Sequence, residues 1–296
     1  MKCIYNFGIY CYKQLVALAG MRNAKARKLT QGQKGIFDYL SRKADPQGGY
    51  LWIHASSLGE FEQGRPLIEA IRKARPETRI LLTFFSPSGY EVRKNYEGAD
   101  LVCYLPFDLP GNVKRFLDLT RPTEAIFIKY EFWANYLNEL KRREIPTYII
   151  SAIFRPNQIF FRFYGGYFRR ILRNFTHLYI QNEQSRQLLA GIGITNVSVG
   201  GDTRFDRVSD IRRSAKELPL IERFAQGKKV LIAGSSWPKD EEFLIDYFNR
   251  RDDIKLILAP HEIHESHLLF IESLLKRPAL RYTRATEAEV TARVGL

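Results

Sequence analysis

Short apolar runs alternate with amphipathic stretches along most of the chain. Between the runs, apolar residues return with the period of an α-helix, as in residues 64–75, where Leu67, Ile68 and Ile71 share one face. Strands that alternate with helices at this spacing indicate an α/β fold with a parallel, doubly wound sheet, which places its ligands at the carboxyl ends of the strands. The apolar runs predict strands over residues 51–53, 80–84, 101–104, 125–128, 147–150 and 178–180.

A polar stretch over residues 207–216 interrupts this series, and a new cycle follows it. Apolar runs at residues 230–233 and 255–258 predict two strands of a second α/β domain. Because two strands make too small a sheet to be covered on both faces, we expect this second domain to be incomplete. The predicted organisation is an N-terminal segment over residues 1–40, a first domain over 41–205 and a partial second domain over 206–296.

The first 20 residues are apolar and rich in aromatic side chains, but Lys13 and Gln14 interrupt them. A helix that spans a bilayer needs about 20 mostly apolar residues, so this segment is marginal. Several basic residues follow between Arg22 and Lys34, with no acidic residue before Asp38. This arrangement predicts a helix that anchors the chain at an anionic membrane surface, spanning the bilayer or lying in it. The alternative is an amphipathic helix packed on the core.

The chain carries 46 basic and 32 acidic residues, a net charge of +14. The excess predicts a polyanionic partner, which could be nucleic acid, an anionic membrane or a phosphorylated substrate. A basic and aromatic stretch over residues 155–173 suits any of the three, but the sequence lacks the motifs of common nucleic-acid-binding domains. We therefore expect no nucleic acid.

The cysteines and histidines do not indicate a metal site. Three widely spaced cysteines form no zinc or disulfide pattern. His261, His264 and His267 have no supporting Cys/His pattern, so we expect no metal and place His264 and His267 on a helix surface.

Candidate chemistry follows the predicted strands. Residues 54–60 (HASSLGE) lead from the first strand into a helix, where Ser57 and Gly59 permit a tight turn. Glu60 then stands near the helix N-terminus at the ligand-binding edge, where a carboxylate can act as a general base. The alternative is that Glu60 only complements the helix dipole. Glu131 adds a second carboxylate after the fourth strand, although it too could be a helix-start charge.

Small residues also follow several strands. Ser88 and Gly89 open a helix after the second strand, as an anion site or a plain N-cap. In the second domain, residues 234–236 follow a strand and open a helix, which is a plausible phosphate cradle without the Walker A pattern. His261 follows the next strand, at the same edge.

Taken together, these segments resemble the Kdo transferase family, whose members move the acidic sugar Kdo from CMP-Kdo onto a lipid A precursor. The resemblance runs from the N-terminal segment to about residue 290. It is carried by HASSLGE at 54–60, SPSG at 86–89, YLPFDLP at 104–110, KYEFWAN at 129–135, SAIFRP at 151–156, QNE at 181–183, GGDTRFD at 200–206, AGSSWPKDE at 233–241 and APHE at 259–262.

The resemblance implies a GT-B fold of two Rossmann-like domains, the first facing the cytoplasmic side of the bacterial inner membrane to receive the lipid and the second holding CMP-Kdo. It implies no metal and no cofactor. Glu60 matches the general base and Glu131 the second glutamate of the cleft, and attack from the opposite face would invert the anomeric centre. The substrate-binding residues implied are Ser57, Gly59, Ser88, Gly89, Arg155, Asp202, Arg204, Gly234, Ser235, Ser236, Pro260 and His261.

Two departures from the family pattern matter. Lys129 and Ala134 stand where the family usually has Glu and Pro, and the sequence ends before the family's glycine-rich segment and closing helix. The chain therefore resembles a C-terminally truncated member whose donor pocket lacks one wall. Two alternatives remain open: a GT-B transferase with another nucleotide sugar and lipid acceptor, and an inactive remnant.

Overall fold

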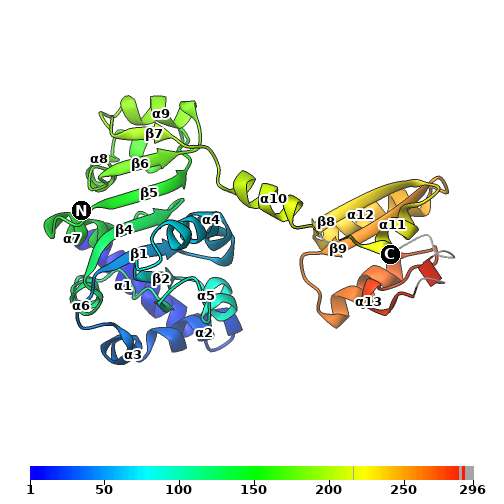
Figure 1. The fold of residues 1–296 in the computed structure, drawn as a ribbon, viewed down its shortest axis with the longest axis horizontal. Coiled ribbons are helices and arrows are strands. Elements are labelled where there is room, and N and C mark those ends of the chain that lie inside the picture. Colours follow the sequence, from blue (N-terminus) through cyan, green and yellow to red (C-terminus); the bar gives the residue numbers. More distant parts are fainter. Residues whose placement is uncertain (216, 287–288, 291–296) are drawn as a thin grey trace. The chain divides into compact units, whose positions relative to one another are not determined.

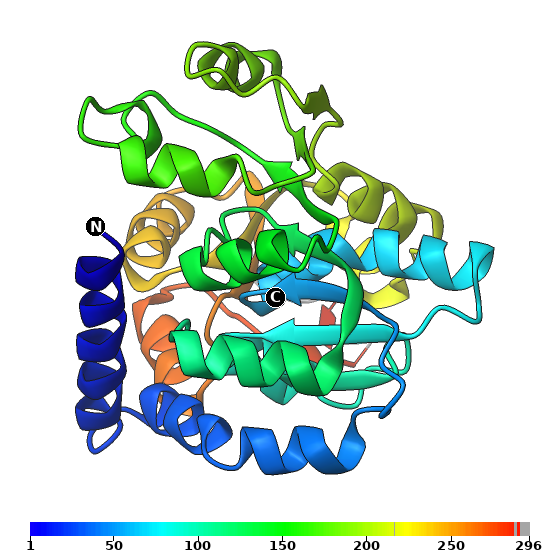
Figure 2. The ribbon, with the colours of Figure 1, turned by 90° about the vertical axis from the view of Figure 1, so that its left-hand side faces the viewer.

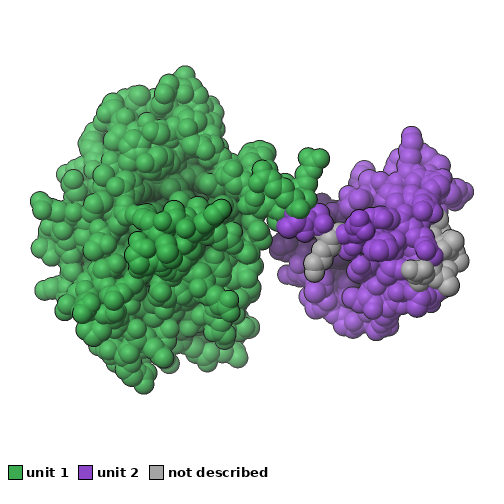
Figure 3. Space-filling model, viewed as in Figure 1, with its two compact units in different colours: residues 1–213 green, residues 214–296 purple. Residues whose placement is uncertain are grey.

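The first unit of the chain is built on a seven-stranded parallel sheet (Figure 1). The computed structural model describes residues 1–215, 217–286 and 289–290. It divides into two compact units, residues 1–213 and 214–296, which Figure 3 shows in separate colours. The sheet has the order β3-β2-β1-β4-β5-β6-β7. Its strands are β1 (Tyr50–Ala55), β2 (Ile80–Phe84), β3 (Leu101–Tyr104), β4 (Pro122–Ile128), β5 (Thr147–Ala152), β6 (His177–Ile180) and β7 (Val197–Val199).

Helices connect the strands and cover the sheet (Figure 2). Ile53 and Ile126 pack with Ile68 of α4 in one buried cluster. Trp52 lies in a second cluster, where its ring centroid is 5.1 Å from that of Phe116 in α6. Successive strand residues therefore fill two separate cores, as parallel strands with both faces covered require. The helices are α1 (Lys2–Ala19), α2 (Ala24–Gln33), α3 (Ile36–Lys43), α4 (Leu58–Ala74), α5 (Pro87–Arg93), α6 (Pro110–Thr120), α7 (Ala134–Arg142), α8 (Gly166–Leu172), α9 (Glu183–Ala190) and α10 (Arg204–Arg213).

The second unit contains a smaller parallel pair of strands, β8 (Lys229–Ser236) and β9 (Ile254–Pro260). Ile245 and Phe248 of α12 pack with Leu256 of β9 and Ile271 of α13 to form its core. Its helices are α11 (Pro219–Ala225), α12 (Pro238–Asn249) and α13 (Glu265–Leu274).

Each strand predicted from an apolar run is confirmed, with ends that differ by a few residues. The pattern missed β7, because its residues Val197–Val199 are largely exposed at the edge of the sheet and form no apolar run.

Helix α1 turns one side toward the first unit. Tyr5 and Val16 pack against the buried cluster, whereas Ile4, Phe7, Leu15 and Leu18 are more than half exposed. Within the part of the chain that the structure describes, no helix combines the length and the apolar character needed to cross a bilayer.

A buried carboxylate fastens α1 to the sheet. The Tyr5 hydroxyl donates to Asp108 Oδ2 at 2.6 Å and accepts from the Ala134 N–H at 3.2 Å. The backbone N–H groups of Asn135 and Tyr136 also donate to Asp108, each at 3.0 Å. Burial raises the pKa of Asp108 to about 6, against the effect of these three hydrogen bonds.

We predict that Tyr5→Phe destabilises the first unit by about 1–3 kcal/mol at neutral pH, because it removes one of the three hydrogen bonds to the buried Asp108 carboxylate and the hydroxyl that accepts from the Ala134 N–H. Ionisation of Asp108 already costs stability as the pH rises through about 6. The variant raises that folded-state pKa further, so the loss in free energy of unfolding should be larger at pH 8 than at pH 5.

Urea unfolding at the two pH values checks this, with Tyr10→Phe on the exposed side of the same helix as control. Equal losses at pH 5 and pH 8 would contradict the role given to Asp108.

Candidate active site

The candidate residues of the first unit gather at the carboxyl ends of β1, β2 and β4. The segments after β1 and β2 are joined directly, because the N–H groups of Phe85 and Ser86 donate to the Ser56 carbonyl at 3.2 and 2.6 Å. Strand β4 lies on the other side of β1, so the segment after β4 reaches the same edge. The parallel register thus brings residues from distant parts of the sequence to one place.

Glu60 lies in the first turn of α4 and is partly buried. Its Oε2 accepts hydrogen bonds from the Ser57 N–H at 2.9 Å and the Ser57 hydroxyl at 3.2 Å. Its Oε1 accepts none from the residues the structure describes. Glu60 therefore caps the helix with one oxygen and keeps the other open.

The surroundings of Glu60 favour the protonated form. Burial raises its pKa first, and the charge of Glu131 adds to the rise, whereas a protonated His54 and the hydrogen bonds from Ser57 act to lower it. A carboxyl whose pKa is raised toward neutrality is a stronger base than an exposed one. Gly59 precedes it in the helix, and a Cβ at Gly59 would meet only Ser57 Oγ, at 4.0 Å. The missing side chain keeps the space beside Glu60 open.

Glu131 is buried in the segment that follows β4. Its Oε2 accepts hydrogen bonds from Trp133 Nε1 at 2.5 Å and from His54 Nε2 at 3.1 Å. His54 lies at the end of β1 and is fully buried. His54 stands in the HASSLGE segment, but the sequence offered no reason to assign it a role. Its contact with Glu131 joins residues that are 77 positions apart.

Left-handed backbone marks two neighbouring positions at this edge. Lys129, directly after β4, has φ 72°, and Ser151, in β5, has φ 53°. Non-glycine residues rarely adopt this conformation, and they concentrate at functional sites. The Ser151 hydroxyl lies 2.9 Å from Thr203 Oγ1, which brings the segment after β7 to the same edge.

Asp202 and Arg204 form a pair next to α4. The Arg204 guanidinium donates to Asp202 Oδ2 at 2.8 and 2.5 Å, and Gln63 Nε2 donates to Asp202 Oδ1 at 2.9 Å. Burial acts to raise the pKa of Asp202, but the hydrogen bonds from Arg204 and Gln63 outweigh it and the pKa is lowered. Gln63, one turn after Glu60, was missed because a buried glutamine has no distinctive sequence pattern.

The remaining candidates of this unit differ in their surroundings. Ser86 Oγ accepts a hydrogen bond from the Ser88 N–H at 3.3 Å, so Ser86 caps helix α5. The sequence alone allows two interpretations of this turn, an anion site and a plain N-cap. A Cβ on Gly89 would lie 2.2 Å from the Phe84 ring, which explains the glycine by packing. Arg155 is exposed, and its guanidinium makes no ion pair or hydrogen bond within the described ranges.

The candidate residues of the second unit also lie together, at the carboxyl ends of β8 and β9. The His261 N–H donates to the Ser236 carbonyl at 2.9 Å, and the rings of His261 and Trp237 stack with centroids 4.5 Å apart. Ser235 has φ 55°, a left-handed conformation at the end of β8. Gly234 stands beside it and pairs with Ala259, while Pro260 pairs with Ser236 across the two strands.

The expectation that His267 lies on the helix surface is wrong; His264 is exposed, as expected. His267 is 6% exposed, with Nδ1 2.8 Å from the Glu262 carbonyl and Nε2 2.7 Å from Glu241 Oε2. A carbonyl and an ionised carboxylate are both acceptors, so this arrangement favours the protonated form of His267. The hydrogen bond to Glu241 is the largest cause of its raised pKa. Among the described residues, no group of His, Cys, Asp and Glu is arranged to hold a metal ion.

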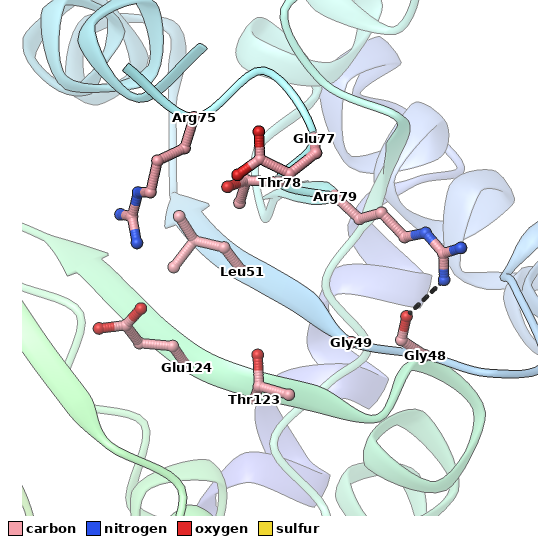
Figure 4. A pocket seen from close by; sticks show the side chains of 9 residues that line it. All are labelled: Gly48, Gly49, Leu51, Arg75, Glu77, Thr78, Arg79, Thr123 and Glu124. Carbon is pink, nitrogen blue, oxygen red and sulfur yellow. Dashed lines mark hydrogen bonds between the residues drawn. The ribbon is translucent and has the colours of Figure 1, made fainter. Parts of the chain in front are cut away.

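A polar hollow of about 450 Å³ lies at the opposite, amino-terminal edge of the large sheet (Figure 4). Arg75, Arg79, Glu77 and Glu124 line it. Arg79 donates to the Gly48 carbonyl at 3.1 Å and pairs with Asp45 at 2.9 Å. Because charges of both signs line this hollow, its electrostatics favour neither an anion nor a cation.

Solved structures with a similar architecture define the fold class. A putative UDP-N-acetylglucosamine 2-epimerase from Listeria monocytogenes matches with a TM-score of 0.54 and 12% identity, covering 77% of this chain and 66% of that one. The UDP-GlcNAc 2-epimerase of Neisseria meningitidis matches with a TM-score of 0.54 and 14% identity, covering 77% and 69%. At this identity the likeness concerns the fold alone. The predicted α/β fold of GT-B type is confirmed.

Within that class, the chain belongs to the 3-deoxy-D-manno-octulosonic-acid transferase (Kdo transferase) family, whose model matches residues 25–207. The family prediction is confirmed. The 3-deoxy-D-manno-octulosonic acid transferase of Haemophilus influenzae is 22% identical over 95% of this chain and 67% of its own length. The protein of that name from Aquifex aeolicus is 27% identical over 74% of this chain and 57% of its own. The chain thus spans about two thirds of one relative's length and less of the other's.

We predict that the His267 ion pair makes the second unit less stable as the pH rises. The folded-state pKa of His267 is raised, so its contribution is complete below about 6.5, the ordinary value, and is lost as the pH rises through the folded-state value. His267→Gln should remove this dependence.

Thermal unfolding followed by fluorescence of Trp237, the tryptophan of the second unit, at pH 6 to 9 measures the effect. The midpoint of the wild-type protein should fall over this range more steeply than that of the variant. Parallel curves would show that His267 is neutral in the folded protein.

Proposed function

We propose that the protein is a glycosyltransferase of lipopolysaccharide biosynthesis that transfers Kdo from CMP-Kdo to a lipid A precursor with inversion. The observation that carries this proposal is the pair Glu60 and Glu131, which lie at one edge of the sheet within the region that matches the family. Each carboxylate has one oxygen held by the protein and one free of hydrogen bonds within the described residues.

Glu60 is the general base in this mechanism. Ser57 fixes its Oε2, so Oε1 is oriented to accept the proton of the acceptor hydroxyl while the oxygen of that hydroxyl attacks the anomeric carbon. The bond from that carbon to the phosphate oxygen breaks, and cytidine monophosphate leaves as an anion. Attack from the face opposite the leaving group accounts for inversion.

The second unit would hold the donor. Small residues at Gly234, Ser235 and Ser236 precede the N-terminus of α12, where backbone N–H groups favour a phosphate. Trp237 is half-exposed and stacks on His261, which offers a flat surface to a nucleotide ring. An anionic leaving group needs such donors more than it needs a proton donor.

The surface of α1 suits a membrane. Its exposed stripe of Ile4, Phe7, Leu15 and Leu18 is unusual for a helix in water, and the exposed basic residues Arg22, Lys25, Lys28 and Lys34 follow it. Apolar side chains next to cations are typical of helices that lie at an anionic lipid surface. Tyr167 contacts Tyr5, which brings the basic segment of residues 155–173 close to α1. These features support the proposed location at the cytoplasmic face of the inner membrane, where the protein would meet its lipid acceptor.

We predict that Glu60→Gln lowers the rate of Kdo transfer by about 10²- to 10⁴-fold, the usual contribution of a general base. The amide oxygen can still accept from Ser57, so the fold should be retained. The assay uses the whole protein, a lipid A precursor and freshly generated CMP-Kdo.

The control is Glu69→Gln, an exposed residue on the same helix that pairs with Arg65. Undiminished transfer by Glu60→Gln would exclude Glu60 as the base. Turnover of a UDP-sugar in place of CMP-Kdo would instead favour another nucleotide-sugar transferase.

We also predict that replacing both Phe7 and Leu15 by Glu weakens partition onto phosphatidylglycerol-containing vesicles at least roughly tenfold, because burial of each side chain is worth about 1.5–3 kcal/mol. Sedimentation with vesicles measures it. Val92→Glu is the matched control, since Val92 is an exposed apolar residue on α5. Unchanged partition would show that α1 does not bind lipid.

A further inference from the structure

A chain of side-chain hydrogen bonds crosses the core of the first unit and ends at Glu131. Trp52 Nε1 lies 2.8 Å from Thr83 Oγ1, which lies 2.8 Å from His54 Nδ1. His54 Nε2 lies 3.1 Å from Glu131 Oε2. Trp52, Thr83 and His54 are fully buried, so each polar atom must find its partner within the protein.

The chemistry of the groups fixes the direction of these bonds. An indole nitrogen only donates, so Trp52 Nε1 donates to the oxygen of the Thr83 hydroxyl. The hydroxyl proton of Thr83 is then free to be donated to His54 Nδ1. An ionised carboxylate only accepts, so His54 Nε2 donates to Glu131. The arrangement is complete when His54 is neutral with its proton on Nε2. The Thr83 carbonyl, 3.1 Å from Nδ1, offers the alternative of a doubly protonated ring.

We infer that His54 is a positioning residue, a neutral imidazole whose Nε2–H donates to Glu131 and fixes this carboxylate beside Glu60. The inference deepens the proposed function, on which its catalytic consequence rests. His54 does not touch the substrate. It acts through Glu131, as the fixed end of a buried chain that begins at Trp52.

The hydrogen bonds at Glu131 show how His54 can orient this carboxylate. Both His54 and Trp133 donate to Oε2, and Oε1 accepts no hydrogen bond within the described part of the chain. A carboxylate held at one oxygen by two rings cannot rotate freely. The orientation of the carboxylate is therefore fixed, and its charge is close enough to raise the pKa of Glu60.

A purely structural role for His54 is the alternative, since any buried polar side chain needs partners. Two amide replacements separate the roles. The Nε2 of glutamine stands near the position of the imidazole Nε2 and can donate to Glu131. Asparagine is shorter and can keep only the contact with Thr83. Both leave the core polar at the same position.

In the transferase assay, we expect His54→Gln to retain kcat within about threefold and His54→Asn to lose about 10- to 100-fold, the usual cost of a misplaced catalytic group. The KM for CMP-Kdo should change little in either variant. Thermal unfolding of both variants tests whether the fold persists. Equal kcat in the two variants, or a loss confined to KM, would overturn the inference.

The acid limb of the pH profile gives a second measurement. Two titratable groups act on the pKa of Glu60: Glu131, from the segment after β4, raises it, and His54, from β1, lowers it when the imidazole is charged. In His54→Asn the Glu131 carboxylate is no longer held beside Glu60, so the repulsion between the two carboxylates falls. The pKa of Glu60 should then fall, and the acid limb of the pH profile of kcat should move to lower pH. If His54 were charged, its removal would move the limb to higher pH and overturn the assignment.

Nitrogen-15 NMR of His54 tests the inference without activity. We expect the neutral tautomer with the proton on Nε2 between pH 6 and 8, and a Glu60 carboxyl that titrates at lower pH in His54→Asn, by carbon-13 NMR. A doubly protonated ring, or the proton on Nδ1, would overturn the inference. If the protein transfers no Kdo while these signals agree, the proposed function fails and the role of His54 stands.

Discussion

The central position of β1 in a parallel sheet is the constraint on which the site of the first unit depends. Because β1 pairs with β2 on one side and with β4 on the other, His54 stands opposite both Thr83 and Phe127. The segments after the three strands therefore end at one edge, and Glu60 and Glu131 meet although they are far apart in the sequence. A shift of one residue in either pairing would turn His54 to the opposite face and break its contact with Glu131.

In both units a hydrogen bond between a buried histidine and a glutamate holds the segments that follow the strands. In the first, a histidine of β1 holds a glutamate from the segment after β4. In the second, Glu241 joins Ser236, at the end of β8, to His267, which also holds the Glu262 carbonyl after β9. The partners of the second ring nitrogen differ between the two histidines. His54 Nδ1 lies near both the hydroxyl and the carbonyl of Thr83, whereas His267 Nδ1 lies near the Glu262 carbonyl.

Most strands could be predicted because buried parallel strands are short apolar runs, and Glu60 could be selected because a strand-to-helix turn places it at the ligand edge. The remaining features depend on pairing between strands. Within a run, Trp52 and His54 look like ordinary strand residues, and only the register with β2 brings both to Thr83. His267 follows a helical pattern that suits a surface, and its burial depends on the fold of the preceding loop.

The contact between α1 and Asp108 has a mechanical consequence. Tyr5 bonds to the backbone of Ala134, three residues after Glu131, and Asp108 bonds to the next two residues. Buried hydrogen bonds therefore join helix α1 to the segment that carries the second carboxylate. If α1 lies in lipid as proposed, the depth of α1 also sets the height of Glu131 above the bilayer, so an acceptor that diffuses in the plane of the membrane would approach at one level.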